Sequence, residues 1–128
     1  MLRKGGQVPG PAYDLAAFQA EVQKRNVHVY KGRALDIIKV LRECSQAEAR
    51  AFARRTVLML TPDDYAHTLK MPDGQIQDVY GRLIAGEGWY LKIEINRYDG
   101  QPGIVSCHPA AYDLVTRSGV VPSSGRKF

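Results

Sequence analysis

One ten-residue stretch, residues 88–97, constrains the fold more than any other part of this 128-residue chain. Apolar and polar side chains alternate along it without a break, reading Gly-Trp-Tyr-Leu-Lys-Ile-Glu-Ile-Asn-Arg. Successive side chains of a β-strand point to opposite faces, so this pattern predicts a strand with one apolar and one polar face. The apolar set is Trp89, Leu91, Ile93 and Ile95, and the opposite set is Tyr90, Lys92, Glu94 and Asn96.

Turn signals on both sides of this strand predict its partners. Asp99-Gly100 is a hairpin turn that leads to a strand near residues 103–108. Upstream, residues 75–85 form another strand candidate, connected through the Gly-Glu-Gly turn at 86–88. Consecutive strands with short turns predict an antiparallel meander.

The N-terminal half has helical spacing instead. The expected elements are a helix from Asp14 to Asn26, a short strand over 27–30, a helix over 34–43, and a helix after the capping box of Ser45 and Glu48. Residues 61–64, Thr-Pro-Asp-Asp, are typical of a helix start and predict a short helix that contains His67. Residues 110–117 predict one more helical turn. Helices packed on the apolar face of the meander give an α+β fold.

Length and composition fit a single domain. We expect a flexible arm over residues 1–12, one domain over 13–117, and a flexible basic tail over 118–128. The start has no apolar signal-peptide core, and no apolar run approaches the length of a membrane span, which predicts a soluble, cytoplasmic protein. Cys44 and Cys107 have no zinc-binding spacing and are expected to be ordinary thiols in a reducing compartment.

Positive charge is concentrated in residues 24–55. The chain carries 18 Lys and Arg against 13 Asp and Glu. Nine of these bases and three of these acids lie in residues 24–55, so that segment is +6 and the remainder is −1. Two interpretations remain open: a solvated helical surface, or a surface for phosphates or an acidic partner.

Two of the three histidines lie where they could transfer protons. His67 precedes the expected sheet and His108 ends its last strand, whereas His28 is assigned a structural or surface role. An imidazole with a pKa of about 6.5 can take or give a proton at neutral pH. No metal-binding histidine spacing, phosphate-binding glycine loop or Gly-x-Ser-x-Gly motif is present, so we expect chemistry from side chains on a sheet face, without metal or cofactor.

Several motifs resemble the MqsR family of toxin endoribonucleases. The residues concerned are Gln77-Asp78-Val79-Tyr80, the Tyr-Leu-Lys-Ile stretch at 90–93, the Ile-Val-Ser at 104–106, and the Leu60–Leu69 segment before them. The resemblance covers about residues 14–109. It implies a RelE-like fold, an antiparallel sheet with N-terminal helices on one face, and metal-independent cleavage of mRNA by the toxin of a type II toxin–antitoxin pair.

The same resemblance implies a set of site residues. The family glutamine and tyrosine fall on Gln77 and Tyr90, and two family lysines fall on His67 and His108. These four are the predicted catalytic residues. Two histidines suit the reaction, because cleavage through the 2′-hydroxyl needs a base for that proton and an acid for the leaving 5′-oxygen.

Two further residues are expected to contact RNA. Lys92 would neutralise the phosphate, and Arg82, placed in a loop after Tyr80, would clamp it. Glu94 is assigned no role in catalysis. The predicted partners are mRNA, either free or on the ribosome, and a cognate antitoxin, with no membrane. The alternative is a non-catalytic basic module, either a gyrase-binding toxin of the same fold or an RNA-binding protein, acting through residues 24–55.

Overall fold

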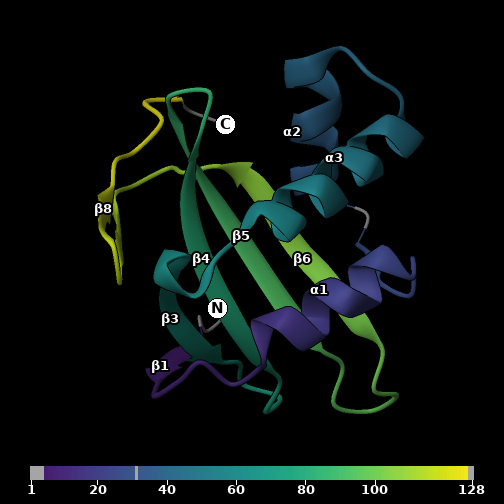
Figure 1. Ribbon diagram of the computed structural model, residues 1–128, viewed down its shortest axis with the longest axis vertical. Coiled ribbons are helices and arrows are strands. Elements are labelled where there is room, and N and C mark those ends of the chain that lie inside the picture. Colours follow the sequence, from purple (N-terminus) through teal and green to yellow (C-terminus); the bar gives the residue numbers. More distant parts are fainter. Residues whose placement is uncertain (1–4, 31, 127–128) are drawn as a thin grey trace.

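The computed structural model describes residues 5–30 and 32–126. Three helices and a six-stranded sheet form the body of the molecule, and a small β-hairpin packs against it (Figure 1). The elements are β1 (Gly6–Val8), α1 (Leu15–Gln23), β2 (His28–Val29), α2 (Arg33–Arg42), α3 (Gln46–Met59), the 3-10 helix η1 (Pro62–Asp64), β3 (Tyr65–Lys70), β4 (Ile76–Ile84), β5 (Glu87–Ile95), β6 (Pro102–Pro109), β7 (Leu114–Thr116) and β8 (Gly119–Val121).

The sheet has the order β1-β3-β4-β5-β6-β2. Strands β4, β5 and β6 form the expected antiparallel meander; β3 extends it antiparallel to β4, and β1 adds to that edge antiparallel to β3. At the other edge β2 pairs parallel with β6, so the sheet is mixed. The α+β class is confirmed.

The helices cover one face of the sheet. Their main core contains the apolar set of β5, including Trp89, Leu91 and Ile93, as the alternation predicted. Asp14 accepts a hydrogen bond from the Ala17 amide at the start of α1. The predicted capping box of Ser45 and Glu48 is present at the start of α3. Both cysteines are free thiols.

The prediction of a short helix after residue 61 is wrong. The Thr-Pro-Asp-Asp signal makes only the single 3-10 turn η1, and the chain then enters strand β3, which carries His67. Tertiary contacts explain the change. The Thr68 hydroxyl lies 2.6 Å from both the Tyr65 hydroxyl and a carboxylate oxygen of Asp78, and these buried hydrogen bonds align β3 with β4.

The segment expected to be a loose arm is tied to the sheet. Residues 6–8 are strand β1, and the backbone amides of Ala12 and Tyr13 donate to the Asp78 carboxylate. Residues 1–4 of the predicted arm lie outside the described residues.

The C-terminal segment also differs from the expectation. Residues 114–116 form strand β7 rather than a helical turn, and β8 lies within the expected tail. Each strand is too short to show a periodicity, so its pairing with the other strand decides its structure. Residues 127–128 of the tail lie outside the described part of the chain.

The β7–β8 hairpin packs on the sheet face opposite the helices. Its Leu114 and Val121 form a second apolar cluster with Val79, Tyr90 and Ala110. Two glycines make this close packing possible. A Cβ on Gly81 would lie 2.9 Å from a Leu114 methyl carbon, and one on Gly88 only 2.0 Å from the Pro122 carbonyl oxygen. The hairpin therefore covers part of this face and leaves the rest open. Among the described residues, no helix is long and apolar enough to cross a membrane.

Candidate functional site

The face opposite the helices, here called the site face, collects most of the predicted site residues. Directly paired residues of neighbouring strands share a face, so the strand register defines rows across the sheet. His67, Val79, Lys92 and Ser106 form one row across β3, β4, β5 and β6. Gly81, Tyr90 and His108 form the next row, beside the β7–β8 hairpin. His67, Lys92, Tyr90 and His108 therefore lie on one surface, although they come from three strands.

Lys92 lies at the centre of this set. Burial lowers its pKa below the ordinary value of 10.5, and the neighbouring Glu94 carboxylate works against that shift. Its ammonium nitrogen is 6.0 Å from the Tyr90 ring centroid. Burial also lowers the pKa of His67 below 6.5, and the positive charge of Lys92 adds to this effect. His67 is therefore mainly neutral at neutral pH and able to accept a proton.

Tyr90 and His108 form a stacked pair beside the hairpin. Their ring centroids are 5.1 Å apart with only 14° between the ring planes. The edge of Tyr112 closes the other side of Tyr90, which is 8% exposed. Burial raises the Tyr90 pKa well above 10, so its hydroxyl stays protonated. The His108 Nδ1 atom lies 2.8 Å from the Pro109 carbonyl oxygen. A carbonyl oxygen only accepts, so this Nδ1 carries the hydrogen.

Gln77 lies on the site face but its amide is engaged by Glu94. Its Nε2 donates to Glu94 Oε1 at 2.9 Å, and the Tyr30 hydroxyl donates to Glu94 Oε2 at 2.7 Å. Gln77 Oε1 is buried and has no hydrogen-bond partner among the described residues. Leaving such an acceptor unpaired costs about 1–3 kcal/mol, so this amide is fixed at an energetic penalty.

Glu94 is the site residue that sequence reasoning missed. It is 5% exposed and lies two residues from Lys92 on the same strand face. The alternation of β5 placed Glu94 beside Tyr90 and Lys92. That pattern could not show that Gln77 and Tyr30 both donate to the Glu94 carboxylate. Burial and the Glu94 carboxylate raise the pKa of Tyr30 to about 12, which keeps this hydroxyl a donor.

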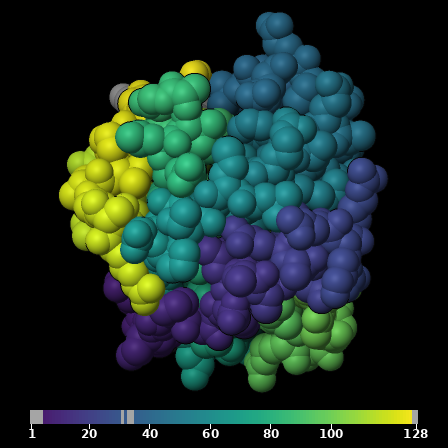
Figure 2. All heavy atoms as spheres, viewed as in Figure 1, coloured from purple at the N-terminus to yellow at the C-terminus, as the bar shows by residue number. Residues whose placement is uncertain are grey.

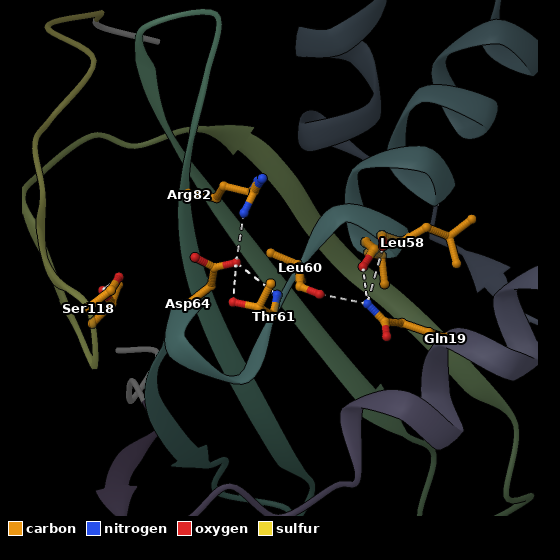
Figure 3. A network of polar contacts seen from close by, with 9 residues as sticks. Gln19, Leu58, Leu60, Thr61, Asp64, Arg82 and Ser118 are labelled. Carbon is orange, nitrogen blue, oxygen red and sulfur yellow. Dashed lines mark hydrogen bonds and ion pairs between the residues drawn. The ribbon is translucent and has the colours of Figure 1, made fainter.

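The predicted position of Arg82 is wrong. It lies within strand β4 rather than in a loop, opposite Trp89, and therefore on the helix side of the sheet. There its guanidinium donates to the Asp64 carboxylate at 3.1 Å (Figure 3). The same carboxylate also accepts from the Thr61 amide, so Arg82 stabilises the turn before β3.

The two histidines are farther apart than the sequence suggested. Three strand spacings and two residues along a strand separate their Cα atoms, which amounts to about 16 Å. His67 and Lys92 are separated by only two strand spacings, about 10 Å. Lys92 rather than either histidine therefore occupies the middle of the site face.

Most of the basic segment lies on the other side of the sheet. Helices α2 and α3 carry this part, and they form one continuous surface in the space-filling view (Figure 2), whereas residues 24–30 lead into β2 at the edge of the sheet. The Arg42 guanidinium stacks over the Phe52 ring at 4.1 Å, whereas Arg55 is exposed. Lys31 lies outside the described residues. The surface of α2 and α3 and the site face are consequently two separate candidate surfaces.

No family model, curated protein or solved structure matches this chain. The resemblance to the MqsR family thus rests on the sequence motifs alone, and both the family and the RelE-like fold stay predictions. The site has to be interpreted from its own geometry. Across residues 5–30 and 32–126, no three His, Cys, Asp or Glu side chains are grouped to hold a metal ion.

Proposed function

We propose that this protein is a metal-independent endoribonuclease that cleaves mRNA, the toxin of a type II toxin–antitoxin pair with a RelE-like fold. One observation carries the proposal. His67, Lys92, Tyr90 and His108 share one face of the sheet, and the half-buried Lys92 lies near a histidine whose pKa is lowered. Cleavage of RNA by its own 2′-hydroxyl requires a proton acceptor, a proton donor and stabilisation of the phosphorane charge, and this surface offers a candidate for each role.

The proposed mechanism follows from the position of each group. Neutral His67 removes the proton from the ribose 2′-hydroxyl, whose oxygen then attacks the adjacent phosphorus. Lys92 neutralises the charge that develops on the phosphorane oxygens. The 5′-oxygen departs with a proton from His108, leaving a 2′,3′-cyclic phosphate and a free 5′-hydroxyl. Tyr90 supports the His108 ring, and Gln77 holds Glu94 near the Lys92 ammonium.

The separation of the two histidines makes the role of His108 testable. An acid that lies about 16 Å from the base must reach a phosphate held over Lys92. We expect His108→Ala to lower kcat if His108 protonates the leaving group. A His108→Phe variant keeps a ring against Tyr90 but has no nitrogen. If the phenylalanine variant restores full kcat, His108 is a stacking residue and the acid lies elsewhere.

The decisive experiment is incubation of the purified full chain with RNA in EDTA, followed by mapping of the ends. We expect cleavage with the products named above, and a loss of 10²- to 10⁴-fold in His67→Ala, the usual contribution of one general base. Lys92→Met should lose activity, whereas the matched control Lys70→Met, an exposed lysine at the end of β3, should retain it. Intact RNA, free or on ribosomes, would refute the nuclease.

A second candidate function is supported by the basic helical surface. A non-catalytic module that binds gyrase or RNA through residues 24–55 requires no His67 or Lys92. Growth arrest on expression without a partner protein distinguishes the two functions. A nuclease loses its toxicity in His67→Ala. A basic binding module keeps its toxicity in that variant and loses it only when the charges of α3 are reversed. The nuclease acts in the cytoplasm, where mRNA and the antitoxin are found.

A further inference from the structure

A cavity of about 500 Å³ opens at the edge of the sheet, between the end of α1 and the β5–β6 turn. Residues that line this cavity include Arg25, His28, Tyr30, Asn96, Asp99 and Gln101. This volume lies within the range of small-ligand sites. Its lining combines polar and aromatic side chains with the aliphatic Val27.

The cavity is connected to the site face through Tyr30. A Cβ on Gly103 would lie 3.1 Å from the Tyr30 ring, so that ring lies over Gly103, which pairs with Glu94 on the site face. The Tyr30 hydroxyl donates to Glu94, and Gln77 donates to the same carboxylate. A continuous polar path therefore runs from the surroundings of Lys92 to the cavity.

The chemistry of the lining fits one unpaired nucleotide. His28 and Tyr30 present two rings whose centroids are 4.7 Å apart at an interplanar angle of 64°, which leaves one face of the exposed His28 ring for stacking. Arg25 supplies a cation, and no ion pair engages it among the described residues. The β5–β6 turn adds polar atoms to the lining. Asn96 Oδ1 accepts from the Tyr98 and Asp99 amides, and Asp99 Oδ1 accepts from the Gln101 amide, so the second carboxylate oxygen of Asp99 is the one placed to accept from the edge of a base.

We propose that this cavity binds an unpaired base of the RNA strand whose scissile phosphate lies at Lys92. The inference rests on the proposed function, because it assigns the cavity to the same substrate. His28 and Lys92 are separated by two strand spacings and two residues along the strand, about 12 Å between Cα atoms. A short oligonucleotide can span that distance. The cavity is then a specificity subsite that selects where the strand is cut.

Binding is measured separately from cleavage with a fluorescent 2′-O-methyl RNA oligonucleotide, which lacks the attacking hydroxyl. We expect His28→Ala to lower the affinity by about 5- to 100-fold, because the base then loses its stacking on an aromatic ring. His28→Phe should restore the affinity. Arg25→Gln should weaken binding and reduce its salt dependence, whereas the control Lys70→Gln, exposed at the end of β3 and outside the basic segment, should leave both unchanged.

An abasic scan of the oligonucleotide provides the sharper test. One abasic position should weaken binding as much as His28→Ala does, and the combination of the two should cost no more than either alone. Additive losses at every position, or a mononucleotide that binds as tightly as the oligonucleotide, would overturn the subsite. If the abasic position and His28→Ala are coupled in this way but the parent protein leaves ordinary RNA intact, the proposed nuclease activity is refuted. The proposal that the cavity binds RNA is then still supported.

Discussion

Asp78 gives the most direct test of how this fold positions its site face. Its carboxylate is fully buried on the helix side of β4 and accepts three hydrogen bonds. The donors are the Ala12 amide at 3.0 Å, the Tyr13 amide at 2.9 Å and the Thr68 hydroxyl at 2.6 Å. One side chain thus joins the N-terminal segment, β3 and β4 beneath Gln77.

We expect Asp78→Ala to lower the free energy of unfolding by about 3 kcal/mol. Each unsatisfied donor costs about 1–3 kcal/mol, and the low end applies to the two amides because water can reach them. With a urea slope of about 2 kcal/mol/M, the unfolding midpoint should fall by about 1.5 M. Asp78→Asn retains one acceptor oxygen and should lose only about 1 kcal/mol.

Urea unfolding followed by circular dichroism measures both losses. The matched control is Asp63→Ala, because Asp63 is exposed and its carboxylate has no hydrogen-bond partner among the described residues. This control should remain within about 0.5 kcal/mol of the parent. If Asp78→Ala is equally close to the parent, the three hydrogen bonds do not stabilise the fold and the reasoning is wrong.

Three further predictions concern pH, charge and packing. The acidic limb of the kcat/KM profile should lie below pH 6.5, because protonation of His67 removes the base and the His67 pKa is lowered by burial and by Lys92. Lys92→Met should raise the His67 pKa and move this limb to higher pH. Reversing Arg50 and Arg55 to Glu should slow association with an acidic antitoxin in stopped-flow experiments at low salt. Gly88→Ala should destabilise the fold by about 1–3 kcal/mol in thermal unfolding, because the new methyl group meets a backbone carbonyl oxygen that cannot move aside.

Each of these predictions has a result that contradicts it. An acidic limb that does not move in Lys92→Met would show that His67 is not the titrating base. An unchanged association rate at low salt would leave residues 24–55 as a solvated face. Gly6→Ala is the control for the packing variant, because a Cβ at Gly6 contacts nothing within 4 Å.

The strands that could be predicted from the sequence are those with a long alternation. Strand β5 has nine residues, and the direction of each side chain followed from the period of two. The same rule applied to β4 would have placed Gln77 and Arg82 on opposite faces. The expected loop after Tyr80 conflicts with the strand candidate over residues 75–85, which includes Arg82. The loop placement was enough to assign a structural arginine to the site.

The parts that could not be predicted depend on contacts between distant segments. The hydroxyl groups of Tyr65 and Thr68 select a strand where the local signal favours a helix, and their partner Asp78 lies ten residues beyond Thr68. The role of Glu94 depends on Tyr30, which is 64 residues away. Residue spacing and composition do not show which side chains from distant segments meet in the fold.

The alternation along β5 also provides two optical reporters on one strand. Trp89 is the only tryptophan of the chain, is 5% exposed, and packs against Phe52 in the main core. Its neighbour Tyr90 points to the opposite face and stacks on His108. Tryptophan emission therefore reports the integrity of the core, whereas ring-current shifts in the Tyr90 proton resonances report the site face. A variant that changes the second signal and leaves the first unchanged has altered the site without unfolding the protein.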